Sequence, residues 1–287
     1  MNEPEIAVVI PTRNRARYLD VALASLAHQR PAVPHELLVV DDCSTDATAE
    51  IIAAHDVPHL SQIKPLGLNA ARNAGVRATS APIVAFVDDD VWVPPGWLEA
   101  LAEGARRHPR ADAFGGPIVA RLEGPTPRGC GREKPPITTL DLGPDDVPVT
   151  MVWGANMAIR RRAFERVGAF DETIGGHGDE EDWLRRLRQA GGSIEYLAAA
   201  GLAHRRADGD ARLLPLTRAA YHRGRAARRS DERQRLAPAI GSELRTFGGC
   251  LWHTLRRGCP QGLIMGAHAA GRLRQAAAPG ASDRGRP

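Results

Sequence analysis

The stretch from residue 83 to residue 90 constrains the fold more than any other, because five apolar residues lead directly into three consecutive aspartates (IVAFVDDD). An apolar run of this length after Pro82 predicts a strand that is buried on both faces. Adjacent carboxylates repel one another and are costly to desolvate, so at the end of such a strand they favour a bound cation. A hard divalent ion with a phosphate partner fits them. A solvated acidic turn before the next helix is the alternative.

Two earlier stretches repeat this pattern. Residues 6–10 (IAVVI) run into the polar sequence PTRNR, and residues 37–40 (LLVV) run into two further aspartates. A leucine stripe over residues 19–26 has the spacing of a helix that packs on a sheet, and residues 67–78 form a second helical stretch. Strands that alternate with helices in this way predict an α/β fold class with a mainly parallel sheet flanked by helices.

The polar residues that follow these strands should lie close together. In sheets of this kind, ligands bind beyond the carboxyl ends of the strands. Pro11–Thr12, Asp41–Asp42 and Asp88–Asp90 each follow a predicted strand. We therefore expect the three clusters to meet at one edge of the sheet and to form a single site, rather than three unrelated turns.

The length of 287 residues suits one large α/β domain with a C-terminal extension. Its last predicted strand is residues 194–197. We expect the domain to cover residues 1–210 and a helical, arginine-rich extension to cover residues 211–287, with a disordered end rich in Ala, Gly, Pro and Arg. A proline- and glycine-rich loop over residues 121–149 is long enough to be either functional or disordered.

The net charge of +4 conceals an uneven distribution. From His204 onward the chain carries 17 Arg or Lys against 6 Asp or Glu, a net charge of +11, and residues 1–203 carry −7. A basic extension favours contact with phosphates, anionic lipid or nucleic acid. A basic amphipathic region on an anionic membrane is one interpretation, and a solvated domain surface is the other. Because few aromatic residues interleave the arginines, we expect no nucleic-acid partner.

The cysteines indicate the compartment. Cys43, Cys130, Cys250 and Cys259 show no paired metal-ligand spacing and are too sparse for a disulfide scaffold, which favours a reducing cytosol. We expect neither a signal peptide nor a membrane anchor, and the apolar stretch 247–271 is interrupted by Arg and Pro. The predicted localisation is cytoplasmic, with a peripheral contact at the inner face of the membrane as the open alternative.

A second acidic cluster begins a predicted helix at residues 179–184 (DEEDWL), which continues through Leu187 to a stop at Gly191. Acidic residues in a first helical turn interact favourably with the exposed amides and the helix dipole. That preference explains the cluster without any chemical role. A role in catalysis is the other interpretation.

Six motifs, in order, resemble those of the family 2 glycosyltransferases of the GT-A fold. They are residues 9–15 (VIPTRNR), 39–46 (VVDDCSTD), 69–75 (NAARNAG), 86–90 (FVDDD), 153–157 (WGANM) and 179–187 (DEEDWLRRL). The resemblance covers residues 5 to about 205. It implies a Rossmann-like nucleotide-diphospho-sugar transferase domain, with residues 1–100 as the nucleotide-binding half and residues 101–210 as the acceptor-binding half. It further implies a role in cell-envelope or polysaccharide biosynthesis.

The reaction implied by the resemblance is transfer of a sugar, with inversion, from a UDP-, dTDP- or GDP-sugar to an acceptor hydroxyl. The acceptor would be a saccharide, a lipid-linked molecule or a small molecule. The donor nucleotide would contact Pro11, Thr12, Arg13, Asp41, Asp42, Arg72, Asn73, Asp88 and Asp89. The acidic stretch is similar to the family's DXD motif, and the ligands implied for Mg²⁺ or Mn²⁺ are Asp90, Asp88 and His204. A hydrogen-bonded turn residue is the alternative for His204.

Displacement of a sugar from a diphosphate builds negative charge on the leaving group, which a divalent cation stabilises. Inversion in one step also needs a base that takes the proton of the acceptor. The family's usual Glu-Asp pair is exchanged here to Asp179 and Glu180, so we expect Glu180 to be the base and Asp179 to be the second candidate. The acceptor side would include Trp153, Gly154, Ala155 and Asn156, and Asp182 would be either a structural or an acceptor contact at the start of the helix.

Two other classes of protein share some of these features. A sugar nucleotidyltransferase would have the same sheet and acidic edge, but the loop after residue 10 lacks the glycine-rich, lysine-bearing phosphate cradle that attack on a nucleoside triphosphate favours. A non-catalytic homologue would bind nucleotide without turnover. The acids at residues 88–90 and 179–182 argue against it.

Overall fold

The structure is a computed structural model that describes residues 3–29, 33–131, 136–175 and 178–277. The described residues form two compact units. The first, called the α/β unit, lies within Met1–Ala120, Thr138–Ile174 and Asp179–Arg205. The second, called the helical unit, lies within Arg121–Ile137, Gly175–Gly178 and Arg206–Pro287. The predicted disordered end at residues 278–287 lies outside the described residues.

The elements follow one another as the alternating sequence pattern predicts over the first hundred residues. The strands are β1 (Ile6–Thr12), β2 (His35–Asp41), β3 (His59–Ser61), β4 (Ile83–Val87), β5 (Val91–Trp92), β6 (Ala113–Gly115), β7 (Ile118–Leu122), β8 (Val147–Val149), β9 (Asn156–Arg160), β10 (Ile194–Tyr196) and β11 (Leu202–Arg206). The helices are α1 (Ala16–Ala27), α2 (Thr48–Ala54), α3 (Leu68–Ala78), α4 (Trp97–Arg107), α5 (Arg161–Val167), α6 (Asp179–Gln189), the 3₁₀ turn η1 (Asp208–Ala211), α7 (Leu213–Gln234), α8 (Ile240–Arg257) and α9 (Gln261–Ala276).

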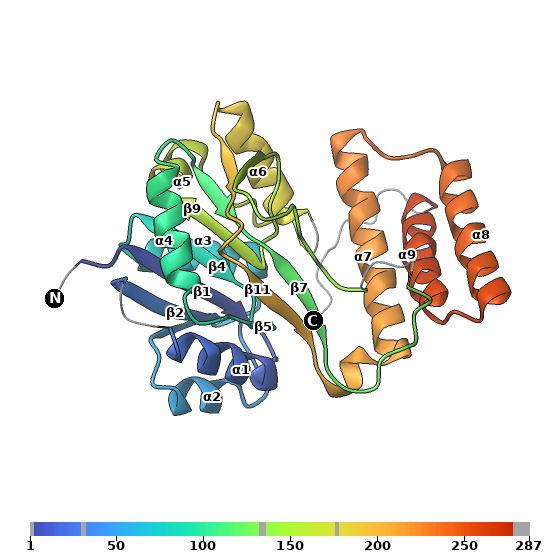
Figure 1. Ribbon diagram of the computed structural model, residues 1–287, viewed down its shortest axis with the longest axis horizontal. Helices are drawn as coiled ribbons and strands as arrows, with labels where there is room; N and C mark the ends of the chain where they lie inside the picture. Colours follow the sequence, from blue (N-terminus) through green and yellow to red (C-terminus); the bar gives the residue numbers. More distant parts are fainter. Residues whose placement is uncertain (1–2, 30–32, 132–135, 176–177, 278–287) are drawn as a thin grey trace. The chain divides into compact units, whose positions relative to one another are not determined.

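An eight-stranded sheet flanked by helices forms the centre of the α/β unit, in the order β3-β2-β1-β4-β9-β6-β10-β8 (Figure 1). Strands β3, β2, β1 and β4 run parallel, and so do β6 and β10. Strand β9 runs antiparallel to both of its neighbours, and β8 runs antiparallel to β10. The sheet is therefore mixed and mostly parallel, as the sequence predicts.

The side chains of β1 show how the two faces of this sheet are covered. Ile6, Val8 and Ile10 belong to the core that also contains apolar side chains of α1, α2 and α4. Ala7 and Val9 belong to the core with side chains of α3, α5 and α6. Because successive residues of a strand point to opposite faces, a continuous apolar run is what a strand covered on both sides requires.

A smaller sheet, in the order β5-β11-β7, lies beyond the end of β4. The sequence pattern predicts no strand after residue 197, and here the prediction was wrong. Strand β11 carries one His and two Arg in five residues, so it lacks the apolar pattern that identifies a strand. It pairs antiparallel with β5, which places His204 opposite Val91, the residue that follows the three aspartates.

The helical unit is built on α9, which packs against both α7 and α8 (Figure 1). The close approach of α7 and α9 depends on glycine, because a Cβ on Gly224 would lie 2.0 Å from the carbonyl oxygen of His268. Buried ion pairs also hold this unit together, since Arg272 and Arg228 both contact Glu243. Among the described residues, no helix has the length and apolar character that crossing a membrane needs.

Candidate active site

The three polar clusters meet at the carboxyl edge of the sheet, as expected, because β2, β1 and β4 are neighbours. The hydroxyl of Thr12 donates a hydrogen bond to Asp89 Oδ2 at 2.7 Å. The backbone N–H of Asp42 donates to the carbonyl of Thr12 at 2.9 Å. The ends of strands that are distant in sequence are therefore joined by direct hydrogen bonds.

Arg15 is a site residue to which sequence reasoning gave no role. Its Nε lies 2.9 Å from Asp89 Oδ1, and its Nη2 lies 2.6 Å from Asp90 Oδ2. A guanidinium that bridges two carboxylates offsets part of their mutual repulsion. The available signal was its position, since Arg15 follows the end of β1 at the same edge as the acids.

His204 also belongs to this cluster. Its Nε2 lies 3.2 Å from Asp90 Oδ2, and its Nδ1 lies 3.3 Å from the carbonyl oxygen of Thr138. Both His204 and Asp90 are buried. If Nδ1 carries the proton, the Nε2 lone pair and the Asp90 carboxylate face one another, and a shared cation would bind both.

Two of the three aspartates have raised pKa values. Burial raises the pKa of Asp88, and the negative charge of Asp90 raises it further. Burial also raises the pKa of Asp89, to about 7, against the opposing effect of Arg15. Carboxylates with raised pKa values favour an added positive charge. Asp90 and His204 are in contact, and the carboxylate oxygens of Asp88 and Asp90 and the imidazole of His204 are of the ligand types that bind Mg²⁺ or Mn²⁺.

Asp42 is fixed by the loop that precedes α3. Its two carboxylate oxygens accept hydrogen bonds from the backbone N–H groups of Leu66, at 2.7 Å, and Gly67, at 3.0 Å. Asp41 accepts a hydrogen bond from the N–H of Ser44 at 3.1 Å. Both aspartates are buried, whereas Arg13 is exposed at the start of the loop after β1. Asp42 thus has a fixed position next to the end of β1.

The second acidic cluster contains a buried ion pair and a carboxyl group with an unusual pKa. Arg72 of α3 pairs with Asp179 at the start of α6. Burial favours a higher pKa for Asp179, but the charge of Arg72 opposes it and the pKa is lowered. Burial raises the pKa of Glu180 well above its ordinary value of 4.5, and the charge of Asp179 adds to that rise. Adjacent carboxyl groups therefore differ in their affinity for a proton.

Helix α3 also holds the segment that leads toward α6. The side-chain amide of Asn69 donates to the carbonyl of Asp171 at 2.7 Å. Asn73 donates to the carbonyl of Phe170 and accepts from the N–H of Phe170, both at 2.9 Å. The amide of Asn73 donates in addition to Glu172 Oε1. Both polar ends of the Asn73 side chain are therefore used within the protein, whose fold they stabilise.

The predicted acceptor residues at 153–156 divide into two groups. A Cβ on Gly154 would lie 2.2 Å from Nη2 of Arg72, and the N–H of Gly154 donates to Glu180 Oε1 at 3.4 Å. Trp153 is half-buried and precedes this contact. Ala155 and Asn156 are buried, and Asn156 accepts from Trp97 Nε1 at 3.2 Å and donates to the carbonyl of Ala200 at 2.8 Å. Gly154 thus lies beside the second acidic cluster, and Asn156 lies in the core.

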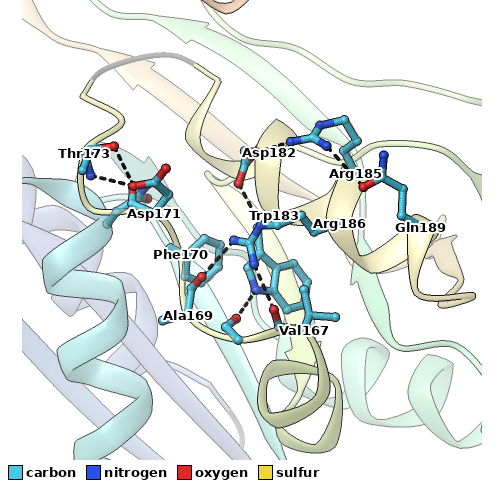
Figure 2. A network of polar contacts seen from close by, with 12 residues as sticks. Val167, Ala169, Phe170, Asp171, Thr173, Asp182, Trp183, Arg185, Arg186 and Gln189 are labelled. Atoms are coloured by element: carbon cyan, nitrogen blue, oxygen red, sulfur yellow. Dashed lines mark hydrogen bonds and ion pairs between the residues drawn. The ribbon is translucent and has the colours of Figure 1, made fainter. Parts of the chain in front are cut away.

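Asp182 is engaged by its own helix (Figure 2). It pairs with Arg185 and with Nε of Arg186, the latter at 2.9 Å. Arg186 in turn donates to the carbonyls of Val167, at 3.0 Å, and Ala169, at 2.8 Å. These contacts attach α6 to the segment after α5, so a structural role explains Asp182 without an acceptor.

The sequence model of one family, described as glycosyl transferase family 2, matches residues 7–168. The chain belongs to this family. The match includes the ends of β1, β2 and β4, and it stops before α6 and His204.

Several glycosyltransferases are similar to this chain in sequence. The pre-mycofactocin glycosyltransferase of Mycobacterium tuberculosis is 34% identical over 210 residues, which are 70% of this chain and 42% of the relative. The validoxylamine A glucosyltransferase of Streptomyces hygroscopicus is 30% identical over 210 residues, covering 62% and 50%. The chain thus spans about half the length of these two relatives. The N-acetylglucosaminyl-diphospho-decaprenol L-rhamnosyltransferase of M. tuberculosis is 29% identical over 256 residues, covering 76% and 81%.

Solved structures establish the fold as GT-A. The mannosyltransferase PcManGT from Pyrobaculum calidifontis, solved with GDP-Man and Mn²⁺, matches with a TM-score of 0.60 at 16% identity, over 100% of this chain and 77% of that one. GalNAc-T7, solved with UDP, GalNAc and Mn²⁺, also has a TM-score of 0.60 at 16% identity, over 79% and 48%. At this level of identity the likeness concerns the fold alone.

Proposed function

We propose that the chain catalyses inverting, metal-assisted transfer of a sugar from a nucleoside-diphosphate donor to an acceptor hydroxyl. The observation that carries the proposal is Glu180, a carboxyl group with a raised pKa that is held next to an Arg72–Asp179 ion pair in a family 2 glycosyltransferase domain. A carboxylate with a raised pKa is a stronger base than an ordinary one. GDP-Man in one solved structure, and UDP with GalNAc in the other, support the choice of donor class.

On the donor side, we propose that Asp42 faces the nucleoside and that Pro11, Thr12, Arg13 and Asp41 complete its surroundings. The guanidinium of Arg72 supplies positive charge toward the phosphates, and Asn73 acts by fixing the position of α3. Asp88 and Asp90, with His204, would hold Mg²⁺ or Mn²⁺. When bound, such an ion stabilises the negative charge that develops on the leaving diphosphate. Asp89 accepts a hydrogen bond from Thr12 and pairs with Arg15, and we propose that it stabilises the loop conformation at the end of β4.

The proposed reaction is a single displacement. The acceptor oxygen forms a bond to the anomeric carbon as the bond from that carbon to the diphosphate oxygen breaks, and Glu180 takes the acceptor's proton. Asp179 is the weaker candidate for the base, because Arg72 lowers its pKa. Its role is to orient Arg72 and to raise the pKa of Glu180. Gly154 leaves room for Arg72, and Trp153 offers a flat surface for the acceptor sugar.

The proposal is tested by incubating the purified protein with UDP-, dTDP- and GDP-sugars, Mn²⁺ and candidate acceptors, and by measuring release of nucleoside diphosphate. We expect at least one donor to release it, and we expect Asp90→Asn to suppress the release. Release of pyrophosphate from a nucleoside triphosphate and a sugar phosphate would instead identify a nucleotidyltransferase. Nucleotide binding without turnover, for every donor and acceptor, would identify a non-catalytic homologue.

The acceptor class is proposed from the helical unit. Helix α8 exposes a row of large apolar side chains, which includes Leu244, Trp252 at 63% and Leu255 at 81% exposure, and Arg245 and Arg256 flank this row. A helix with an exposed apolar face and flanking arginines suits the surface of an anionic membrane. We propose a peripheral contact of this kind, and a lipid-linked acceptor with it. One relative is named as a decaprenol-linked rhamnosyltransferase, which supports this choice.

Sedimentation with vesicles tests the membrane contact. We expect the protein to bind vesicles that contain phosphatidylglycerol more tightly than vesicles of phosphatidylcholine, and we expect Leu255→Asp to weaken binding. Ile63→Asp is the matched control, because Ile63 is 98% exposed in the α/β unit. Equal binding by the wild type and Leu255→Asp would exclude this surface.

A further inference from the structure

Three metal-ligating side chains that are distant in the sequence converge in the helical unit. The ligand atoms of Cys130, His253 and Cys259 all lie within 4.8 Å of one another. They come from the loop after β7, from the last turns of α8 and from the connection between α8 and α9. The cysteines have no paired spacing along the chain, so only the tertiary fold brings them together.

The measured separation suits a tetrahedral zinc ion. Sγ of Cys130 lies 3.6 Å from Nε2 of His253. In zinc sites the metal lies about 2.3 Å from sulfur and about 2.0–2.1 Å from nitrogen, and with tetrahedral angles these lengths place the two ligand atoms about 3.6 Å apart. The distance in the structure, at which the two atoms can also share a hydrogen bond without a metal, therefore matches the separation of two zinc ligands.

The connection between α8 and α9 holds two of the three ligands in place. Gly258 ends α8 with a left-handed conformation, at a φ of 58°, and Pro260 directly precedes α9. At the start of α9, a Cβ on Gly262 would lie 2.2 Å from Oγ1 of Thr254, so the two helices meet closely. This tight turn returns Cys259 to the side of His253 and buries it, whereas Cys130 remains exposed on its loop.

We propose that Cys130, His253 and Cys259 bind a zinc ion that attaches the loop after β7 to the α8–α9 connection. Two thiolates and an imidazole form a soft donor set, which selects Zn²⁺ over Mg²⁺ and Mn²⁺. Each cysteine releases its thiol proton to solvent as its sulfur binds the ion. A solvent molecule takes the fourth position. The site is chemically distinct from the oxygen-rich cluster at Asp88–Asp90, and its existence does not depend on the proposed transfer reaction.

The experiment measures metal content directly. Full-length protein is loaded with Zn²⁺, dialysed, and analysed by mass spectrometry for zinc per chain. We expect one zinc ion per wild-type chain and an affinity at least roughly 100-fold weaker for Cys130→Ser, because loss of a ligand exceeds the effect of losing a supporting hydrogen bond. Cys43→Ser and Cys250→Ser are the matched controls and should retain the ion, since neither residue belongs to the cluster. Cobalt substitution should give a thiolate-to-cobalt charge-transfer band that Cys130→Ser lacks.

Cys130→Ser is the decisive variant because Cys130 is exposed, so its replacement leaves the packed connection intact. A second measurement does not need any variant: bound zinc should slow alkylation of Cys130 by a maleimide, and a chelator should restore the rate. The proposal is overturned if wild-type protein retains no zinc, or if Cys130→Ser retains it fully. Metal-free protein can also be tested for a disulfide between Cys130 and Cys259. If such a disulfide is present and the reduced protein still takes up no zinc, the proposal is overturned as well.

Discussion

The two acidic clusters of the α/β unit have similar composition but different distributions of positive charge. In the cluster at residues 88–90, Arg15 contacts two of three carboxylates and His204 approaches one of them. In the cluster at the start of α6, Arg72 pairs with Asp179, and Glu180 keeps a raised pKa. An arginine therefore divides each cluster into a carboxylate with an ionic partner and a carboxyl group whose charge is poorly compensated.

The difference between the clusters lies in the number of acids with a raised pKa and in what surrounds them. The pKa is raised for Asp88 and, despite its ion pair with Arg15, for Asp89, and a histidine contacts the third acid, Asp90, so the first cluster suits a cation. The second cluster has one acid with a raised pKa, Glu180, beside Gly154, whose lack of a side chain makes room for the Arg72 guanidinium. A single carboxyl group with a raised pKa suits the uptake of one proton. Similar residues thus support cation binding in one place and proton transfer in the other.

Replacement of Glu180 by Gln should have the largest effect on activity. The amide cannot take a proton, so we expect kcat to fall by about 10²- to 10⁴-fold while the affinity for the donor nucleotide is retained. The measurement is nucleoside diphosphate release at saturating donor, with calorimetry for binding. Glu181→Gln, one residue along the same helix, is the control and should keep kcat within a few fold. Unchanged transfer by Glu180→Gln would move the base to Asp179.

Arg72→Met should affect stability more than any other change at this site. It leaves the buried carboxylate of Asp179 without its cation, which we expect to lower the free energy of unfolding by about 3–5 kcal/mol. Denaturant titration measures the loss. The double variant Arg72→Met with Asp179→Leu should recover most of it, because no uncompensated charge is then buried. If the double variant is as unstable as the single one, the ion pair is not what sets the geometry of this cluster.

Asp90→Asn tests the first cluster as a cation site. Removal of a ligand charge should weaken Mn²⁺-dependent binding of the nucleoside diphosphate by roughly 100-fold, since the ion contributes several kcal/mol of charge stabilisation. Binding of the nucleoside diphosphate is measured with and without Mn²⁺. Without the ion, the wild type and Asp90→Asn should bind the nucleotide with the same, weaker affinity. Asp20→Asn is the control, because Asp20 pairs with His55 away from this edge. An equal loss with and without Mn²⁺ would assign Asp90 a purely structural role.

The pH dependence of kcat/KM should report on the second acidic cluster. A base must be deprotonated, so kcat/KM should rise with pH through the pKa of Glu180, which lies above 4.5. The negative charge of Asp179 raises that pKa. Asp179→Asn should therefore move the rising limb of the profile toward lower pH, even if the overall rate falls. A limb that stays in place would show that another group controls it.

Asp182→Asn should give the smallest effect. Its ion pairs with Arg185 and Arg186 lie within one helix near the surface, and such pairs contribute about 0.5 kcal/mol to stability. We expect a small change in the denaturation midpoint and an unchanged KM for the acceptor. A large rise in that KM would instead give Asp182 the acceptor contact that the sequence suggests.

Part of this site could be predicted from the sequence because it depends on local patterns. The strands β1, β2 and β4 are continuous apolar runs, and the polar residues that follow them identify the edge where a ligand would bind. Parallel pairing of neighbouring strands then brings Thr12, Asp42 and Asp89 together without further information. Glu180 is similarly marked by its position in the first turn of α6.

The remainder depends on contacts that no local pattern encodes. The sequence places Arg15 in the loop after β1. Its ion pairs with Asp89 and Asp90, however, depend on how that loop packs. His204 lies on β11, whose charged residues do not follow the apolar pattern of a strand. Pairing with the two-residue strand β5 sets the position of His204. Cys130 and Cys259 are separated by most of the helical unit. Their proximity follows from how helices pack, which spacing along a chain does not reveal.

Helix α3 has a consequence for how this protein can diversify. Asn69 and Asn73 bind the backbone at residues 170–171, and Arg72 of the same helix pairs with the start of α6. These three side chains belong to one helix, so a substitution in α3 can alter the position of the proposed base without any change in α6. Variants of this protein with identical acidic residues can therefore still differ in how well they remove a proton.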